Sequence, residues 1–68
     1  MNMFAERLKK ELKQNNITMY RLAKDLNLSK QTVVNWCSGA NEPKATQIAE
    51  ICKYLDCSAD YLLGLSDI

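Results

Sequence analysis

Hydrophobic residues recur along this chain at spacings of three and four, which is the period of an α-helix. In the first segment, Phe4, Leu8 and Leu12 follow one another at intervals of four residues. Half-buried strands would instead alternate apolar and polar residues, and no such alternation continues for more than a few residues. The pattern therefore predicts an all-α fold.

Polar residues suited to helix ends divide this pattern into five helices. Thr18, Ser29 and Ser58 precede apolar helical runs and are expected to act as N-caps. Asn27 and Gly39 follow such runs and are expected to end helices, because both accept a positive φ. Asn15-Asn16 and the Asp56-Cys57 turn end two others. The expected core side chains are Phe4, Leu8, Leu12, Leu22, Ala23, Leu26, Val33, Trp36, Cys37, Ile48, Ile51, Cys52, Leu55, Tyr61, Leu62 and Leu65. Connections of two to five residues then predict a compact single domain over residues 1–68.

Composition narrows the possible functions. With 68 residues the chain is too short for a doubly wound nucleotide-binding fold or a (β/α) barrel. It has no histidine, no Gly-rich phosphate loop and no carboxylate pair on an apolar face, so we expect no enzyme, no cofactor and no metal site. No apolar run approaches the roughly 18 residues of a membrane span, and the amino terminus lacks a signal peptide. A soluble intracellular protein is expected.

The chain has three cysteines, Cys37, Cys52 and Cys57. Because this number is odd, a disulfide framework that pairs all of them is impossible. Reduced, packed thiols are the simplest interpretation. A thiol sensor is an alternative, and Cys57 is its best candidate because it directly precedes a helix, where a thiol pKa can fall.

The stretch from Met19 to Ser38 reads MYRLAKDLNLSKQTVVNWCS and predicts two short helices joined by a very short turn. Ala23 is small enough for the two helices to approach, and Asn27 accepts the backbone conformation of the turn. Val33 and Trp36 attach the second helix to the core. One face of that helix is left without an internal role, and it carries Lys30, Gln31, Val34, Asn35 and Ser38.

At these residues the chain resembles the Cro/repressor-type, lambda-repressor-like helix-turn-helix family of bacterial and phage transcription regulators. The resemblance extends over FAERLKKEL, ITMYRLAKDLNLSKQTVVNWCSGANEPK and IAEICKYLDCSADYLLG. It implies a five-helix domain with its helix-turn-helix at about residues 19–38. It also implies a cytoplasmic protein that is encoded by a bacterium or a phage. Its implied partner is an operator in double-stranded DNA.

The resemblance assigns base reading to Lys30, Gln31, Val34 and Asn35. An α-helix fits the major groove, where Gln and Asn suit adenine and Lys suits the acceptors of guanine. Val34 suits a thymine methyl group. A second set is expected to contact the DNA backbone, and consists of Thr18, Met19, Tyr20, Ser29, Thr32, Ser38, Asn41 and Lys44.

The chain departs from the family pattern at three places. Met19 stands where glutamine is common, so backbone N–H groups and the Tyr20 hydroxyl are expected to replace its phosphate contact. Glu42 lies in a loop that is often basic. Arg21 stands where a carboxylate or amide is common, and the sequence leaves open whether it faces DNA or pairs internally.

Dimerisation is expected because one recognition helix reads only about 4–5 base pairs, and two-fold dimers read two half-sites. The resemblance places the contact near the loop before the fourth helix and at the start of the fifth, around Ala59 and Tyr61, with Leu62 expected in the core. The tail from Leu65 to Ile68 is too short for a separate dimerisation or effector domain. A repressor that occupies its promoter is the expected role, and a protein-interaction module of an antitoxin or anti-repressor circuit is the alternative.

The charges are unevenly distributed although nine basic and eight acidic side chains leave a net charge of +1. Residues 1–24 carry six basic and two acidic side chains, whereas residues 44–68 carry two basic and four acidic ones. In the first segment, Glu6–Lys10 and Arg7–Glu11 are spaced to form ion pairs. The low net charge predicts weak non-specific DNA binding and places more weight on base contacts and dimerisation.

Overall fold

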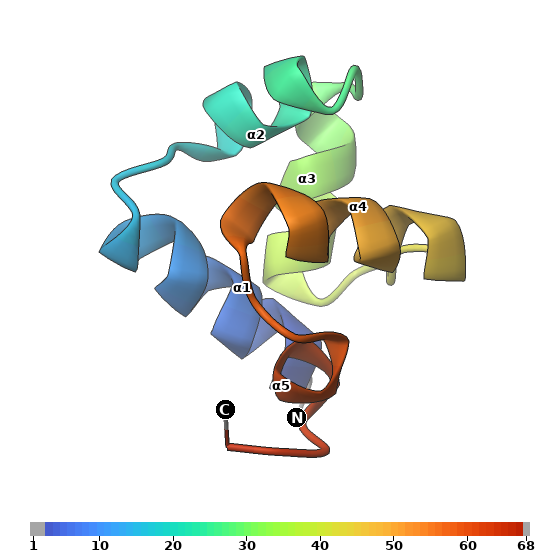
Figure 1. Cartoon of the computed structure of the whole chain (residues 1–68). Helices are drawn as coiled ribbons and strands as arrows, with labels where there is room; N and C mark the ends of the chain where they lie inside the picture. The colour runs from blue at the N-terminus through green and yellow to red at the C-terminus, as the bar shows by residue number, and fades with distance from the viewer. Residues whose placement is uncertain (1–2, 68) are drawn as a thin grey trace.

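Five helices account for most of residues 3–67, which are the residues described by this computed structural model of the chain (Figure 1). Their bounds are α1 Met3–Gln14, α2 Met19–Asp25, α3 Lys30–Ser38, α4 Ala45–Leu55 and α5 Ala59–Leu63. No strand occurs within the described residues, so the predicted all-α fold is confirmed. No helix among them is long and apolar enough to cross a bilayer.

Three helices begin at the predicted caps. The side-chain oxygen of Thr18 accepts a hydrogen bond from the backbone N–H of Arg21 at 3.0 Å, and Ser29 accepts one from Thr32 at 3.2 Å. Ser58 caps α5 in the same way. At α4 the N-cap is Lys44, whose own N–H donates to the side chain of Gln47 at 2.7 Å. Each cap satisfies an N–H group that the helix leaves without a partner.

The helix ends also lie where the polar residues predicted them. Asn16 and Asn27 have φ values of 56° and 59°, and Asp56 after α4 has φ 55°. Gly39 ends α3 with φ 85°, a conformation that a side chain would strain. The left-handed backbone conformation at these residues changes the chain direction within a few positions, and the connections between helices are therefore short.

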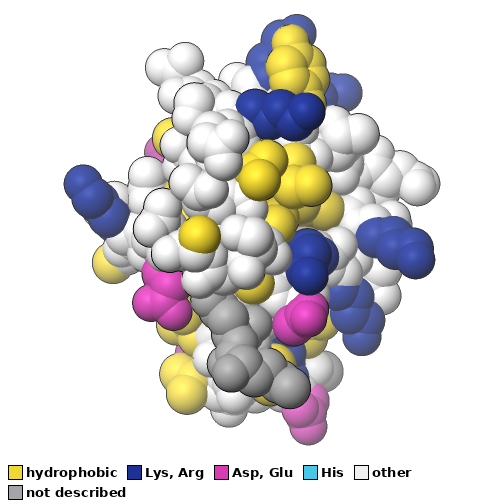
Figure 2. Space-filling view, turned by 180° about the vertical axis from the view of Figure 1, so that it is seen from behind, with side chains coloured by type: hydrophobic (Ala, Val, Ile, Leu, Met, Phe, Trp, Pro, Cys, Tyr) yellow, Lys and Arg dark blue, Asp and Glu magenta, His cyan; other side chains and the backbone are white. Residues whose placement is uncertain are grey.

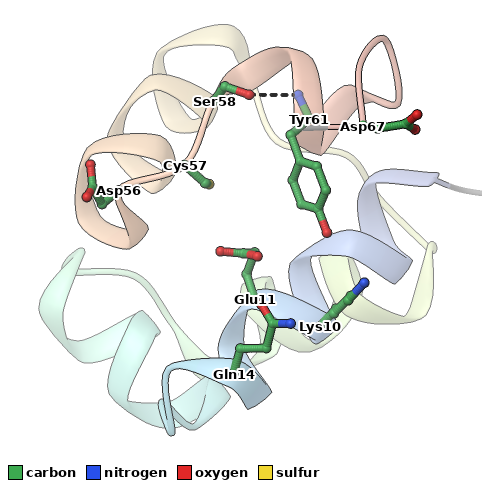
Figure 3. A pocket seen from close by; sticks show the side chains of 8 residues that line it. All are labelled: Lys10, Glu11, Gln14, Asp56, Cys57, Ser58, Tyr61 and Asp67. Atoms are coloured by element: carbon green, nitrogen blue, oxygen red, sulfur yellow. Dashed lines mark hydrogen bonds between the residues drawn. The ribbon is translucent and has the colours of Figure 1, made fainter.

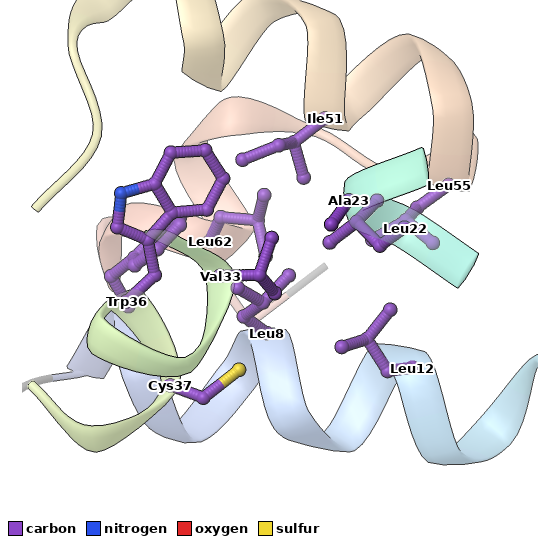
Figure 4. Packing of buried hydrophobic residues seen from close by; sticks show 11 residues of the cluster. Leu8, Leu12, Leu22, Ala23, Val33, Trp36, Cys37, Ile51, Leu55 and Leu62 are labelled. Carbon is purple, nitrogen blue, oxygen red and sulfur yellow. The ribbon is translucent and has the colours of Figure 1, made fainter. Parts of the chain in front are cut away.

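All five helices contribute side chains to the core, whose packing is seen in Figure 4. Leu8 of α1, Leu22 of α2, Val33 of α3, Ile51 of α4 and Leu62 of α5 are fully buried. The other predicted core side chains that are buried are Phe4, Leu12, Ala23, Trp36, Cys37 and Leu55. Half-buried positions are Leu26, Ile48, Cys52 and Tyr61.

One core prediction is wrong. Leu65 is 75% exposed, because Gly64 ends α5 with φ 82° and turns the chain outward before Leu65. Ile68, at the end of the same tail, lies outside the described residues.

Both predicted ion pairs on α1 are also replaced by other contacts. Glu6 pairs with Lys9 at 3.3 Å instead of Lys10. Arg7 turns toward the end of the chain, where its guanidinium donates to the carbonyl oxygens of Tyr61, at 2.6 Å, and Ser66. It also lies 4.4 Å from the centre of the Tyr61 ring and 3.7 Å from Asp67. Arg7 thus fastens α5 and the residues after it to α1.

Candidate nucleic-acid interface

α2 and α3 are joined by a turn that depends on two residues. Ala23 is 2% exposed, and its carbonyl accepts a hydrogen bond from the N–H of Leu28 at 2.7 Å. Asn27 takes the left-handed conformation, and its N–H donates to the carbonyl of Lys24. The chain therefore passes from α2 to α3 in four residues, as the helix-turn-helix pattern predicts.

α3 has a buried side and an outer side. Val33, Trp36 and Cys37 are buried against the other helices. The four residues predicted to read bases share the outer side, since Lys30 and Val34, Gln31 and Asn35, and Gln31 and Val34 are four or three positions apart and so are neighbours on a helix. Lys30 and Gln31 are exposed, whereas Val34 and Asn35 are half-buried.

Gln31 and Asn35 are joined by a hydrogen bond between their side chains. The amide nitrogen of Gln31 donates to the amide oxygen of Asn35 at 2.9 Å. The backbone carbonyl of Asn35 in turn accepts from the N–H groups of Ala40 and Asn41, and from the Ser38 hydroxyl at 3.1 Å. These contacts hold the two amide side chains together and fasten the loop after α3 to the same turn of helix.

The residues predicted to contact the DNA backbone lie at three helix starts, at the end of α3 and in the loop after it. Thr18, Met19 and Tyr20 are exposed at the start of α2, where Tyr20 is 60% exposed. At the start of α3, the hydroxyls of Ser29 and Thr32 are 2.8 Å apart and bond to each other. Ser38 and Asn41 are exposed at the end of α3 and in the loop after it, and Lys44 is exposed at the start of α4.

Arg21 pairs internally, which answers the question that the sequence left open. Its Nε donates to Oδ2 of Asp25 at 2.9 Å, and the hydroxyl of Tyr54 donates to the same oxygen. The hydrogen bond from Tyr54, followed by the pair with Arg21, lowers the pKa of Asp25. The spacing of four residues between Arg21 and Asp25 could have suggested their pair. Tyr54 lies 29 residues from Asp25, so no local pattern could have suggested it.

Cys57 lines an open pocket of about 400 Å³ between α1 and the turn after α4 (Figure 3). Glu11 and Gln14 face Asp56 and Cys57 across it. Burial, the neighbouring Cys52 and the carboxylate of Glu11 raise the pKa of Cys57 to about 12. A reactive thiol needs a lowered pKa, so this raised pKa argues against the thiol-sensor alternative at Cys57. Burial also raises the pKa of Cys37 and of Cys52.

The charges separate along the molecule (Figure 2). On the face shown, Lys and Arg side chains gather over the upper and right-hand parts, and Asp and Glu lie in the lower half. The two chain ends lie at the bottom in Figure 1, so on this face most acidic side chains lie toward the chain ends.

Comparison with known proteins supports the same motif. The helix-turn-helix family profile matches residues 8–62. The chain belongs to the helix-turn-helix family.

The chain is 28% identical over 65 residues to a protein of Bacillus subtilis (strain 168) that is named as the uncharacterised HTH-type transcriptional regulator YobD. The aligned region covers 96% of this chain and 58% of that protein, so the chain spans less than two thirds of this relative's length. No solved structure matches the chain.

Family membership confirms the resemblance seen in the sequence. In a helix-turn-helix, the second helix lies in the major groove while the first crosses the DNA backbone. In this chain α2 and α3 occupy the positions of these two helices.

Proposed function

We propose that this protein is a sequence-specific transcriptional repressor of a bacterial or phage circuit, which blocks a promoter by occupying an operator. The observation that carries this proposal is the outer side of α3, where Gln31 and Asn35 are held together by a hydrogen bond. An exposed polar helix face needs only water around it, whereas two joined amides present a fixed pattern of donors and acceptors.

The hydrogen bond between the two amides determines which atoms they offer to a base. Gln31 uses one N–H and Asn35 uses its oxygen. The oxygen of Gln31 and the N–H groups of Asn35 then match the N6 donor and N7 acceptor of adenine in the major groove. Lys30 and Val34 flank this pair and suit guanine and a thymine methyl group.

The proposed backbone contacts surround this reading face. Exposed N–H groups at the start of α2, from Thr18 to Tyr20, suit one phosphate, and Asn41 and Lys44 suit another. Ser29, Thr32 and Ser38 would add hydroxyl contacts at the two ends of α3. No cofactor is needed for any of these contacts.

Gln31→Ala and Asn35→Ala are each expected to weaken operator binding by about 1–3 kcal/mol while the fold is retained. The two losses should not be additive, because each substitution also releases the other amide from its fixed position. Fluorescence anisotropy with labelled operator measures the affinities, and circular dichroism measures the fold. Gln14→Ala, at an exposed position on α1, is the matched control. Wild-type affinity in both α3 variants would show that α3 does not read the operator through these side chains.

The operator itself can be obtained by selecting bound sequences from a random DNA pool with the wild-type protein. Enrichment of one sequence with two related half-sites supports the proposal, and their spacing reports the dimer geometry. Affinity for that sequence should fall steeply with salt, because each neutralised phosphate releases counterions. If no sequence is enriched, the protein-interaction alternative is favoured.

We further propose that two protomers bind one operator through the surface at α5. Ala59 is exposed at its start, and the half-buried Tyr61 is covered on one side by Arg7. Leu63 is 44% exposed and lines a small pocket with Pro43 and Ile48, at the loop before α4. In this proposal a second copy covers these side chains together with the exposed Leu65.

Leu65→Glu is expected to prevent two protomers from binding one operator, because it places a charge in the proposed contact. Leu65 is largely exposed in the monomer, so the melting temperature should stay near that of the wild type. Analytical ultracentrifugation with labelled operator measures how many protomers bind, with Gln14→Glu as control. Two protomers bound with unchanged affinity would place the dimer contact elsewhere.

A further inference from the structure

Asp25, at the end of α2, receives hydrogen bonds from two different parts of the domain. Tyr54, near the end of α4, donates its hydroxyl to Oδ2 of Asp25. Arg21, one turn earlier on α2, donates its Nε to the same oxygen at 2.9 Å. The end of α4, drawn in orange, lies beneath α2 in Figure 1. One carboxylate oxygen thus joins α2 to α4.

Apolar side chains of these two helices also lie near one another. Leu22 and Ala23 of α2 lie beside Leu55 of α4 (Figure 4). Apolar contacts are non-directional and tolerate sliding, whereas a hydrogen bond weakens steeply when its angle or length changes. The bond from Tyr54 to Asp25 is therefore a directional contact that resists rotation of α2 against α4.

That relative orientation matters for DNA binding as proposed above. The segment from Thr18 to Tyr20 lies at the start of α2, and Lys44 is the N-cap of α4. Each of these is a proposed phosphate contact. The phosphates of a duplex have a fixed spacing, so both contacts form together only at one orientation of the two helices. An orientation set in the free protein also avoids an ordering cost on binding.

We infer that Asp25 and Tyr54 are positioning residues for DNA binding, which hold the phosphate contacts of α2 and α4 in register while touching no DNA themselves. Arg21 belongs to this arrangement as the partner that orients the Asp25 carboxylate. The inference rests on the proposed function, because it needs an operator on which both contacts are made.

The test measures operator affinity against salt for Tyr54→Phe, Asp25→Ala, their combination and Asp25→Asn, with the operator selected by the wild type. Tyr54→Phe and Asp25→Ala should each weaken binding by about fivefold, the value of one hydrogen bond, with a shallower salt dependence. The double variant should be no weaker than the weaker single variant, because both lose the same contact. Asp25→Asn keeps an oxygen for Tyr54 and should bind more tightly than Asp25→Ala. Glu50→Gln, an exposed position on α4, shows the effect of removing one negative charge alone.

The affinities are measured at a temperature where circular dichroism shows the variants folded, so that each outcome either supports or overturns the positioning role of Asp25 and Tyr54. Wild-type affinity and salt dependence in Tyr54→Phe, even with a lowered melting temperature, would overturn the inference and leave a purely structural hydrogen bond. Additive losses in the double variant would overturn it too, because the residues would then act separately. If Asp25→Ala does not fold, the operator affinities of Tyr54→Phe and Asp25→Asn still test the positioning role. Failure of the wild type to select any DNA would instead overturn the proposed function, and this inference with it.

Discussion

Trp36→Ala is expected to lower the free energy of unfolding by about 3–5 kcal/mol, enough to unfold much of a domain this small. Trp36 is 2% exposed and lies on the inner side of α3, in the same cluster as Leu8, Val33 and Leu62. Removal of the indole ring leaves a cavity that the surrounding helices can only partly fill. Chemical denaturation followed by circular dichroism measures the change.

Tyr20→Ala is the matched control, because this aromatic side chain is 60% exposed. Its removal should change the free energy of unfolding by less than about 0.5 kcal/mol, as for most surface substitutions. Equal losses for the two variants would contradict the inward placement of Trp36. Since Trp36 anchors α3, its loss should also abolish operator binding, whereas Gln31→Ala should weaken binding in a folded protein.

Arg7→Ala is expected to lower the free energy of unfolding by about 2–3 kcal/mol, which is large for a charged residue on an outer helix. Hydrogen bonds from charged groups stabilise more than neutral ones, and Arg7 donates to the carbonyl oxygens of both Tyr61 and Ser66. Its side chain is only 17% exposed, so packing over the Tyr61 ring is lost as well. Thermal and chemical denaturation measure the change.

Two comparisons separate the effect of the Arg7 hydrogen bonds from a general effect of charge. Lys10→Ala, on the exposed side of α1, should leave stability almost unchanged. Arg7→Lys should recover only part of the loss, because an ammonium group lacks the planar fork that reaches two carbonyls. Full recovery by lysine would mean that the charge stabilises α5, and that the hydrogen-bond geometry does not.

Local chemistry made much of the fold predictable. Thr18, Ser29 and Ser58 each cap a helix through a hydrogen bond that spans three residues, and such a contact depends only on the nearby sequence. Asn27 and Gly39 take the left-handed conformation for a reason that lies in the residue itself. The outer side of α3 followed from the same helical period, once Val33 and Trp36 were placed inside.

Contacts between distant residues were not predictable in this way. The spacing of Arg7 and Glu11 suggested an ion pair, but Arg7 bonds to residues more than fifty positions away, where it finds carbonyl groups at the end of α5. Leu65 suited a core by composition, yet the turn at Gly64 directs it outward. Tyr54 gave no sign of its bond to Asp25, because that bond depends on how α4 crosses α2.

The linear pattern of apolar and capping residues was thus enough to establish five helices, a helix-turn-helix and the side of α3 that faces outward. Each of these follows from hydrogen bonds and side-chain periodicity within one or two turns of helix. Only the tertiary structure decided that Tyr54 bonds to Asp25, that Arg7 fastens the end of the chain, and that Cys57 has a raised pKa. Those outcomes depend on which side chains meet across helix boundaries, and the packing of the whole core determines that.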